Sequence, residues 1–212
     1  MPGVEPPGAA STAQGDPAVR PHNVPPGPPL RRMSSTLRHA SHRESGKPEF
    51  ETEAIAQGQV PSRRLLRVGP APAPGDVAGW LGVAAGQLVM VRKRLQLLNG
   101  VPAVISTSYF PMWVASGTRL ESAEALPEGP ANLIERLGHE FASGIELFRA
   151  RMPSPEEARL LELGPGIPVV RLLHIDYDPQ DRPLQVADDL YAADRHEFAF
   201  EWAEPDRPAR HG

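Results

Sequence analysis

The chain contains LVMVRKRLQLLNGVPAVISTSY at residues 88–109 and a related stretch, PVVRLLHIDYDPQDRPLQVADDLY, at residues 168–191. Each stretch predicts two apolar strands joined by a turn, and each follows a segment with the features of a short helix. Four positions align at offsets of 80 to 82 residues: Gly86 with Gly166, Val89 with Val169, Pro102 with Pro183, and Tyr109 with Tyr191. Two such units are too few for a solenoid. We therefore expect an internal pseudo-repeat that forms one antiparallel sheet flanked by short helices, which is an α+β fold.

The turn in the first stretch leaves the pairing of its two strands open. Asn99-Gly100 between two apolar runs is a strong hairpin signal. A two-residue loop would place Arg94 opposite Ile105, whereas a three-residue loop would place it opposite Ser106. A slip of one residue moves side chains to the other face of a sheet, so the choice decides which residues share a face with Arg94.

Helix signals surround these strands. Ser154, Pro155 and Glu157 predict an N-cap, a first helical residue and a capping box, and Gly164 is expected to end that helix. The remaining expected elements are a short helix at 49–57 that Gly58 ends, a strand at 63–68 and a helix at 131–137.

Composition bounds the class of protein. The 212 residues include 26 prolines and 19 glycines, contain no cysteine and carry a net charge of −4. Without cysteine, disulfides, zinc–thiolate sites and cysteine nucleophiles are excluded. The negative charge argues against a chain that coats nucleic acid. No apolar run approaches the roughly 18 residues of a membrane span, and no signal peptide is seen, so we expect a cytoplasmic protein without membrane contact.

The chain divides into four expected segments. Residues 1–29 hold nine prolines and four glycines without apolar periodicity, which predicts a disordered tail. A basic linker is expected at 30–47, a folded domain at 48–203 and a disordered tail at 204–212. The basic segment has two interpretations, a solvated linker or an arm that contacts DNA phosphates weakly. The arm would use five basic residues: Arg31, Arg32, Arg38, Arg43 and Lys47.

The sequence offers no catalytic constellation. His139, His174 and His196 lack the short spacing of a metal pair, and each is interpreted as a core or surface histidine. Asp188 and Asp189 are adjacent, so on a strand they point to opposite faces and cannot act as a dyad. We therefore expect no catalytic residue, no metal and no cofactor.

The strand at 88–98 has a polar face. Arg92, Arg94 and Gln96 alternate with apolar residues that lie on the other face. This pattern fits either a solvated face or a pocket for an anionic or polar ligand, because arginine offers a fixed fork of donors. Arg92 and Lys93 are expected to face water.

Several stretches, taken in order, resemble the effector-binding UTRA domain of the HutC subfamily of GntR transcription regulators. They are 50–83, VRKRLQLLNGVPAVISTSYFP at 91–111, 149–185, and AADRHEFAFEW at 192–202. The resemblance covers about residues 38–202. It implies a chorismate-lyase-like α+β fold, a homodimer, and a pocket for a small metabolite whose binding alters affinity for operator DNA.

The resemblance also implies which residues line the pocket. In sugar-phosphate-sensing members one strand presents Arg-x-Arg, and here Gln96 replaces the second arginine while Arg94 matches the first. Ser106 and Gln185 stand where acidic residues are expected, and Tyr191 matches a family tyrosine. With the position described next, the candidate ligand-binding residues are Glu49, Arg94, Gln96, Ser106, Gln185 and Tyr191.

Glu49 stands where the family has a serine, and its charge would repel a phosphate. Two alternatives follow. The pocket binds a less charged ligand, for which Arg94 as the main fixed charge would suit a single carboxylate, or the pocket has lost its ligand.

The family's winged helix-turn-helix domain would precede the region of resemblance, and residues 1–29 cannot supply it. DNA contact is therefore expected only through such a domain, if the gene start lies further upstream, or weakly through residues 30–47. The leading interpretation is a metabolite-sensing, dimerising domain of a regulator. The alternative is a stand-alone module that heterodimerises with full-length relatives. A chorismate-lyase-like enzyme is a distant third, because fold does not imply function.

Overall fold

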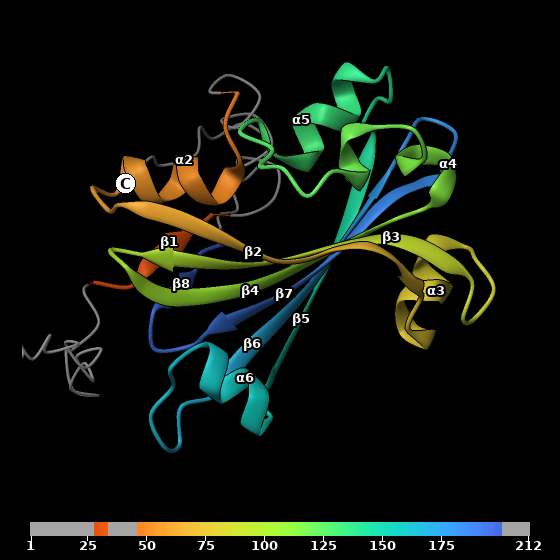
Figure 1. Ribbon diagram of the computed structural model, residues 1–212. Coiled ribbons are helices and arrows are strands. Elements are labelled where there is room, and N and C mark those ends of the chain that lie inside the picture. The colour runs from red at the N-terminus through yellow and green to blue at the C-terminus, as the bar shows by residue number, and fades with distance from the viewer. Residues whose placement is uncertain (1–27, 34–45, 201–212) are drawn as a thin grey trace, which may run out of the picture.

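A six-stranded antiparallel sheet forms the centre of the protein in the computed structural model, which describes residues 28–33 and 46–200 (Figure 1). Its strand order is β2-β3-β4-β7-β6-β5. The strands are β1 (Leu30–Arg32), β2 (Pro61–Pro72), β3 (Leu88–Leu98), β4 (Val101–Phe110), β5 (Ser143–Arg151), β6 (Val169–Tyr177), β7 (Pro183–Ala192) and β8 (His196–Phe198). The helices are α2 (Glu49–Ala56), α3 (Gly75–Leu81), α4 (Met112–Ala115), α5 (Gly129–Arg136), α6 (Pro155–Leu160) and the 3-10 turn η1 (Arg119–Glu121). The expected α+β fold is confirmed.

The sheet is built from two related halves. The units β2-α3-β3-β4 and β5-α6-β6-β7 place their strands so that β4 and β7 meet at the centre and the order reads the same outward. The turns agree as well, because Gly86 and Gly166 adopt φ angles of 78° and 80° just before β3 and β6. The expected pseudo-repeat is thus present in the strand order and in the backbone.

The β3–β4 hairpin combines the two alternatives that the sequence left open. The loop has two residues, since Leu98 pairs with Val101, and Asn99 adopts the positive φ of 52° that such a tight turn requires. The register then shifts by one residue, because Leu97 pairs with Pro102 and Gln96 with Val104. This β-bulge brings Arg94 opposite Ser106, the pairing expected of a longer loop.

The helices divide between the two faces of the sheet (Figure 1). One face packs Val89 and Val91 against Val77 and Leu81 of α3, and α6 covers the same face further along. The other face packs Met90 against α4 and α5. The second face also carries α2, so it is the face on which a cavity can form between sheet and helices.

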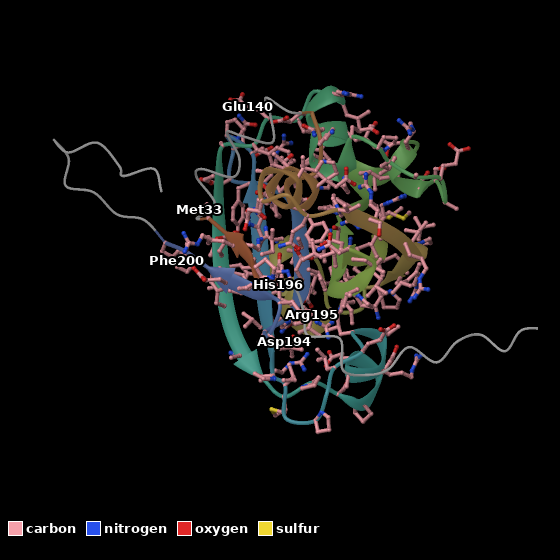
Figure 2. The ribbon with its side chains drawn as sticks, turned by 90° about the vertical axis from the view of Figure 1, so that its left-hand side faces the viewer. Met33, Glu140, Asp194, Arg195, His196 and Phe200 are labelled. Carbon is pink, nitrogen blue, oxygen red and sulfur yellow. The ribbon has the colours of Figure 1, made fainter. Side chains whose placement is uncertain are left out.

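The N-terminal boundary of the domain differs from the expectation. Residues 30–32 are not linker but strand β1, which pairs in parallel with β8 (Figure 2). Arg32 is only 4% exposed, so it can serve neither as a solvated linker residue nor as a phosphate contact. The rest of the expected linker and both expected tails lie wholly or mostly at residues 1–27, 34–45 and 201–212, outside the described residues.

Helix α6 begins as expected but ends earlier. Ser154 accepts a hydrogen bond from the Glu157 amide, and the Glu157 side chain accepts one from the Ser154 amide, which completes the capping box. The helix ends at Leu160, and Glu162 rather than Gly164 adopts the left-handed conformation, with a φ of 50°.

No helix in the described part of the chain is long and apolar enough to cross a membrane.

Candidate functional site

A cavity of about 110 Å³ lies between the centre of the sheet and the helices α2 and α5. Its floor comes from β3, β4, β7 and β6, so both halves of the pseudo-repeat contribute to it. Its other walls come from β1, from α2 and from the start of α5, with apolar patches from Phe50, Phe141 and Leu172. The position over the β4–β7 junction follows directly from the strand order.

Side chains on the cavity floor form rows across neighbouring strands. Arg94, Ser106, Asp189 and Leu172 pair in sequence across β3, β4, β7 and β6. Because residues directly opposite each other in a sheet share a face, all four point toward the same side. The bulge in β4 is what brings Arg94 into this row.

Arg94 is a cation without an anionic partner. Its Nη2 donates to the hydroxyl oxygens of Ser106 at 3.2 Å and of Ser108 at 2.8 Å, and its Nε has no hydrogen-bond partner. It forms no ion pair with any described residue. Burial lowers the pKa of Arg94 to about 10, and the nearby charge of Asp189 offsets only part of this effect. A bound anion would supply the missing partner.

Asp189, next along the row from Ser106, is a carboxylate that is satisfied at one oxygen only. Its Oδ2 accepts a hydrogen bond from the Tyr191 hydroxyl at 3.3 Å, while Oδ1 is buried without a partner. Burial raises the pKa of Asp189, although the Ser106 hydroxyl and the charges of Arg32 and Arg94 act in the opposite direction. The cavity thus holds two oppositely charged groups with unused hydrogen-bonding atoms.

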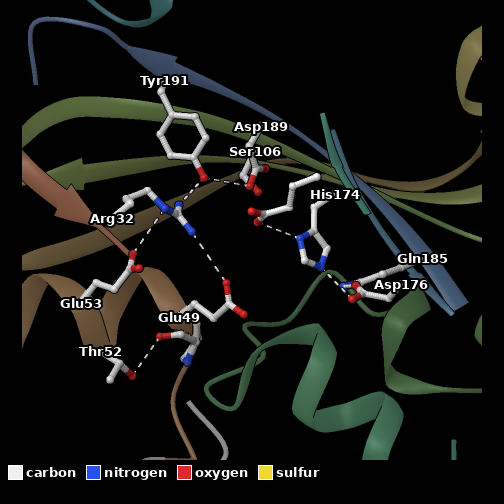
Figure 3. A network of polar contacts seen from close by, with 12 residues as sticks. Arg32, Glu49, Thr52, Glu53, Ser106, His174, Asp176, Gln185, Asp189 and Tyr191 are labelled. Atoms are coloured by element: carbon white, nitrogen blue, oxygen red, sulfur yellow. Dashed lines mark hydrogen bonds and ion pairs between the residues drawn. The ribbon is translucent and has the colours of Figure 1, made fainter. Parts of the chain in front are cut away.

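Arg32 lines one side of the cavity, and Figure 3 shows its contacts with Tyr191, Glu49 and Glu53. It donates to the Tyr191 hydroxyl, and its guanidinium lies 3.4 Å from Glu53 and 3.7 Å from Glu49. Burial alone would lower the pKa of Arg32, but the surrounding negative charges, led by Glu53, outweigh burial and raise it. Arg32 is therefore neutralised by the protein itself, in contrast to Arg94.

His174 links two carboxylates on another part of the wall. Its Nδ1 lies 3.1 Å from Glu146 Oε1, and its Nε2 lies 2.7 Å from Asp176 Oδ1. The second oxygen of Asp176 accepts a hydrogen bond of 2.6 Å from the Gln185 amide (Figure 3). Only the imidazolium form of His174 can donate to both carboxylates at once.

The structure brings most of the predicted site residues together. Five of the six line the cavity: Glu49, Arg94, Gln96, Ser106 and Gln185. Tyr191 is fully buried behind the cavity wall, where it joins Arg32 to Asp189. Their role in ligand binding stays a prediction.

Sequence reasoning missed several residues of the cavity. Asp189 lies two residues before Tyr191 and four after Gln185, so alternation along one strand could have placed it on the same face. His174 was interpreted as a core or surface histidine, but it lines the cavity. Arg32 gave no signal, since a three-residue strand in a basic segment has no recognisable pattern.

Arg92 does not face water, contrary to the expectation. It is 2% exposed and donates at 3.0 Å to the carbonyl oxygens of Leu120 and Glu124, with a further contact to that of Ser122. Its partners are main-chain oxygens of η1 and of the residues just after it, so Arg92 anchors this loop rather than a ligand. Asp188, by contrast, behaves as expected: it faces away from the cavity and pairs with Arg171 at 2.7 Å.

Among residues 28–33 and 46–200, no group of three His, Asp or Glu side chains is placed to hold a metal ion. The cavity lies between a sheet and short helices, and its lining combines hydrogen-bonding groups with apolar side chains. Two of its charged residues, Arg94 and Asp189, each have a side-chain atom without a hydrogen-bond partner. Such a pocket defines a class of α+β domains that can bind small polar molecules.

Comparisons with known proteins agree with this class. A family model described as the UTRA domain matches residues 56–197, and the chain therefore belongs to the UTRA domain family. The ligand-binding domain of a protein from Bordetella bronchiseptica assigned to the GntR family of transcriptional regulators is 29% identical. That structure has a TM-score of 0.57, and the match covers 66% of this chain and 87% of that one.

Two curated relatives are uncharacterised HTH-type transcriptional regulators. The protein from Streptomyces coelicolor is 28% identical over 184 residues, which is 84% of this chain and 68% of the relative. The protein from Rhizobium meliloti is 28% identical over 153 residues, which is 72% of this chain and 58% of the relative. The chain thus spans between about half and two thirds of these regulators, and it corresponds to the effector-binding type of domain of GntR-family regulators.

Proposed function

We propose that the chain is the effector-sensing domain of a cytoplasmic transcriptional regulator of the HutC subfamily, and that its cavity binds a small metabolite. The observation that carries this proposal is Arg94, a partly buried guanidinium held by two serine hydroxyls in a cavity, with no anionic partner among the described residues. An uncompensated buried charge is unfavourable unless a ligand completes it. The six predicted residues, Glu49, Arg94, Gln96, Ser106, Gln185 and Tyr191, form or support this site.

We propose that ligand binding affects DNA binding through strand β1, which forms one wall of the cavity. Arg32 on β1 contacts the cavity and is joined through Tyr191 to Asp189 on the cavity floor. A ligand at this position would alter the environment of a segment near the N-terminal end of the domain. We propose that operator DNA is contacted through a helix-turn-helix domain of the kind named for the relatives, and not through Arg32.

A sensor is favoured over an enzyme, because the relatives are named as transcriptional regulators. Both nitrogens of His174, a histidine of the cavity wall, lie within hydrogen-bond distance of carboxylates, so the protein itself engages both ends of the ring.

We also propose that the domain forms a homodimer through strand β5. This strand lies at an open edge of the sheet, and Ile145 and Leu147 are 40% and 41% exposed on the same side of it. Exposed apolar edge strands favour pairing with another chain. A heterodimer with a full-length relative would use the same edge, and it would be seen as preferential pairing in a mixture of the two proteins.

A thermal-shift screen of the full chain with sugar phosphates, carboxylic acids and amino acids tests the effector site. A ligand at about 100 times its dissociation constant stabilises a protein by about 2.7 kcal/mol, which corresponds to a rise in Tm of about 5–10 °C at this size. The rise should occur in the wild type and in Lys93→Gln, and it should be lost in Arg94→Gln. Lys93 is the matched control, because it neighbours Arg94 but points to the opposite face. Equal stabilisation of Arg94→Gln would place the ligand elsewhere.

A further inference from the structure

Two incompletely satisfied charges in the cavity belong to the same cross-strand row. Arg94 on β3 and Asp189 on β7 both pair directly with Ser106 on β4, which lies between them. Each has a buried side-chain atom without a hydrogen-bond partner, Nε of Arg94 and Oδ1 of Asp189. They do not form an ion pair with each other, since the Arg94 guanidinium is held by Ser106 and Ser108.

From this row we infer that the effector is a zwitterion of the amino-acid type, with its carboxylate on Arg94 and its ammonium group on Asp189. The inference rests on the proposed effector site and deepens it. A molecule with adjacent carboxylate and ammonium groups can lie over Ser106 and present its opposite charges to the side chains on either side of that residue, Arg94 and Asp189. Each protein charge then gains a charge-assisted hydrogen bond inside a cavity, where such bonds are stronger than in water.

The charges around the cavity favour a carboxylate over a phosphate. Arg32 and Arg94 are the arginines that line the cavity among the described residues, and Arg32 already contacts Glu49 and Glu53, so of these two Arg94 has the guanidinium available to a ligand. A phosphate monoester carries up to two negative charges, and Glu49, Asp176 and Asp189 would all repel it. A single carboxylate matches a single guanidinium fork.

The ammonium position follows from the state of Asp189. An ammonium group has only donors, and Asp189 Oδ1 is an acceptor without a donor. The raised pKa of Asp189 and the lowered pKa of Arg94 have the same first cause, burial without full compensation, and a zwitterion would reverse both shifts together. A simple carboxylic acid would complete Arg94 alone and leave Asp189 as it is.

The test is isothermal titration of the full chain with the twenty proteinogenic L-amino acids. For each amino acid that binds, the matched acid without the amino group and the matched amide without the carboxylate are titrated as well. We expect at least one amino acid to bind, and both matched compounds to bind at least tenfold more weakly. These ligand comparisons use the wild-type chain, so they do not depend on whether a variant folds.

A pair of neighbouring variants locates the ammonium group. Asp189→Asn should weaken binding of the amino acid at least tenfold but leave binding of its deaminated acid nearly unchanged. Asp188→Asn should leave both unchanged, because Asp188 points away from the cavity and pairs with Arg171. Both variants remove one carboxylate from adjacent positions of β7, and circular dichroism confirms that each is folded.

The outcomes separate this inference from the proposed function. If sugar phosphates without an amino group or simple carboxylic acids bind in an Arg94-dependent way and amino acids do not, the zwitterion inference is overturned and the effector site stands. If an amino acid binds equally well without its amino group, the assignment of Asp189 is wrong. If no compound of any of these classes binds, both the inference and the proposed effector site fail.

Discussion

Three arginines on one face of the domain are shielded from water, Arg32 and Arg92 almost fully and Arg94 partly, and their partners distinguish their roles. Arg32 is surrounded by the carboxylates of Glu49 and Glu53, and Arg92 donates to main-chain carbonyl oxygens. Arg94 contacts only serine hydroxyls. Arg32 and Arg92 thus have their hydrogen-bonding and charged partners within the protein. Arg94 lacks an anionic partner among the described residues, and we propose that a ligand provides it.

Replacing Arg92 by methionine tests the structural role at the residue scale. The change leaves the carbonyl oxygens of Leu120, Ser122 and Glu124 without their buried donor. We expect Arg92→Met to lower the free energy of unfolding by about 2–4 kcal/mol, since losing charged hydrogen bonds in a buried site leaves unsatisfied acceptors. Urea denaturation measures this value. Lys93→Met, on the opposite face, should change it by less than about 1 kcal/mol; similar effects of the two variants would refute the anchoring role.

Removing the hydroxyl of Tyr191 tests the connection between Arg32 and Asp189. Tyr191→Phe keeps the buried ring but loses the acceptor for Arg32 and the donor to Asp189. A loss of about 1–3 kcal/mol in unfolding free energy is expected, because both partners are in buried surroundings. Tyr109→Phe is the matched control, at the aligned position of the first half of the pseudo-repeat. If thermal melting shows that Tyr191→Phe lowers the stability no more than Tyr109→Phe does, the hydrogen bonds of the Tyr191 hydroxyl do not stabilise the fold.

Part of the cavity could be predicted from sequence. Alternation along one strand assigned Arg94 and Gln96 to the same face, and the resemblance to UTRA domains named Ser106 and Gln185. The same rule would have assigned Asp189, but a lone carboxylate carries no ligand signal until Arg94 is known to be its neighbour in the row. That neighbour relation depends on register, which the sequence left open.

At the scale of elements, the β3–β4 hairpin shows why register could not be predicted. The turn is the two-residue loop that Asn99-Gly100 indicates, yet the register is that of a longer loop, because a bulge follows between Pro102 and Val104. A bulge has no reliable sequence signature, although it re-aims every later side chain of its strand. Strand β1 was missed for a related reason, since its pairing with β8 is set by tertiary contacts and not by its own three residues.

Helix α6 provides a prediction about pH. Glu157 accepts two hydrogen bonds of 2.7 Å from Arg151 and one from the Ser154 amide, and the bond from Arg151 is the main reason that the pKa of Glu157 is lowered from 4.5 to about 2. A lowered pKa in the folded state adds stability above the unfolded pKa, and this stability is lost as the pH falls from about 4.5 through 2.

Glu157→Gln retains a capping side chain but loses the charge. At pH 7 we expect a loss of about 0.5–1 kcal/mol in unfolding free energy, because the pair is only partly buried. Urea denaturation of both proteins from pH 7 down to pH 2 should show the difference shrinking below about pH 4.5. A difference that stays constant over this range would show that the charge on Glu157 is not its source.

At the scale of the whole molecule, the pseudo-repeat explains where the cavity lies. Two units that meet at β4 and β7 place equivalent strands on both sides of one junction, and the polar rows cross it. The repeated sequence predicted this architecture, because related strand pairs must share a sheet. The closing walls, β1 and the helices α2 and α5, break the symmetry, and they lie outside the repeated stretches.

The proposed homodimer is tested at the same scale. A lysine on an edge strand opposes pairing with a second chain, so Leu147→Lys on β5 should convert a dimer to a monomer in light scattering coupled to gel filtration. Ser62→Lys, on β2 at the opposite edge of the sheet, should leave the dimer intact. A Leu147→Lys protein that remains dimeric would show that β5 is not the interface.

The central claim is that a ligand supplies the anionic partner that the partly buried guanidinium of Arg94 lacks. Arginine side-chain NMR tests this claim most directly. The Nε–H resonance of Arg94, assigned by its disappearance in Arg94→Gln, is followed while the amino acids, carboxylic acids and sugar phosphates are added to the full chain. The Nε–H groups of Arg94 and Arg92 both lack a hydrogen-bond partner, but only Arg94 of the two lines the cavity. A bound anion is therefore predicted to shift the Arg94 resonance and to leave that of Arg92 in place. A ligand that binds while the Arg94 resonance stays unmoved would contradict the account.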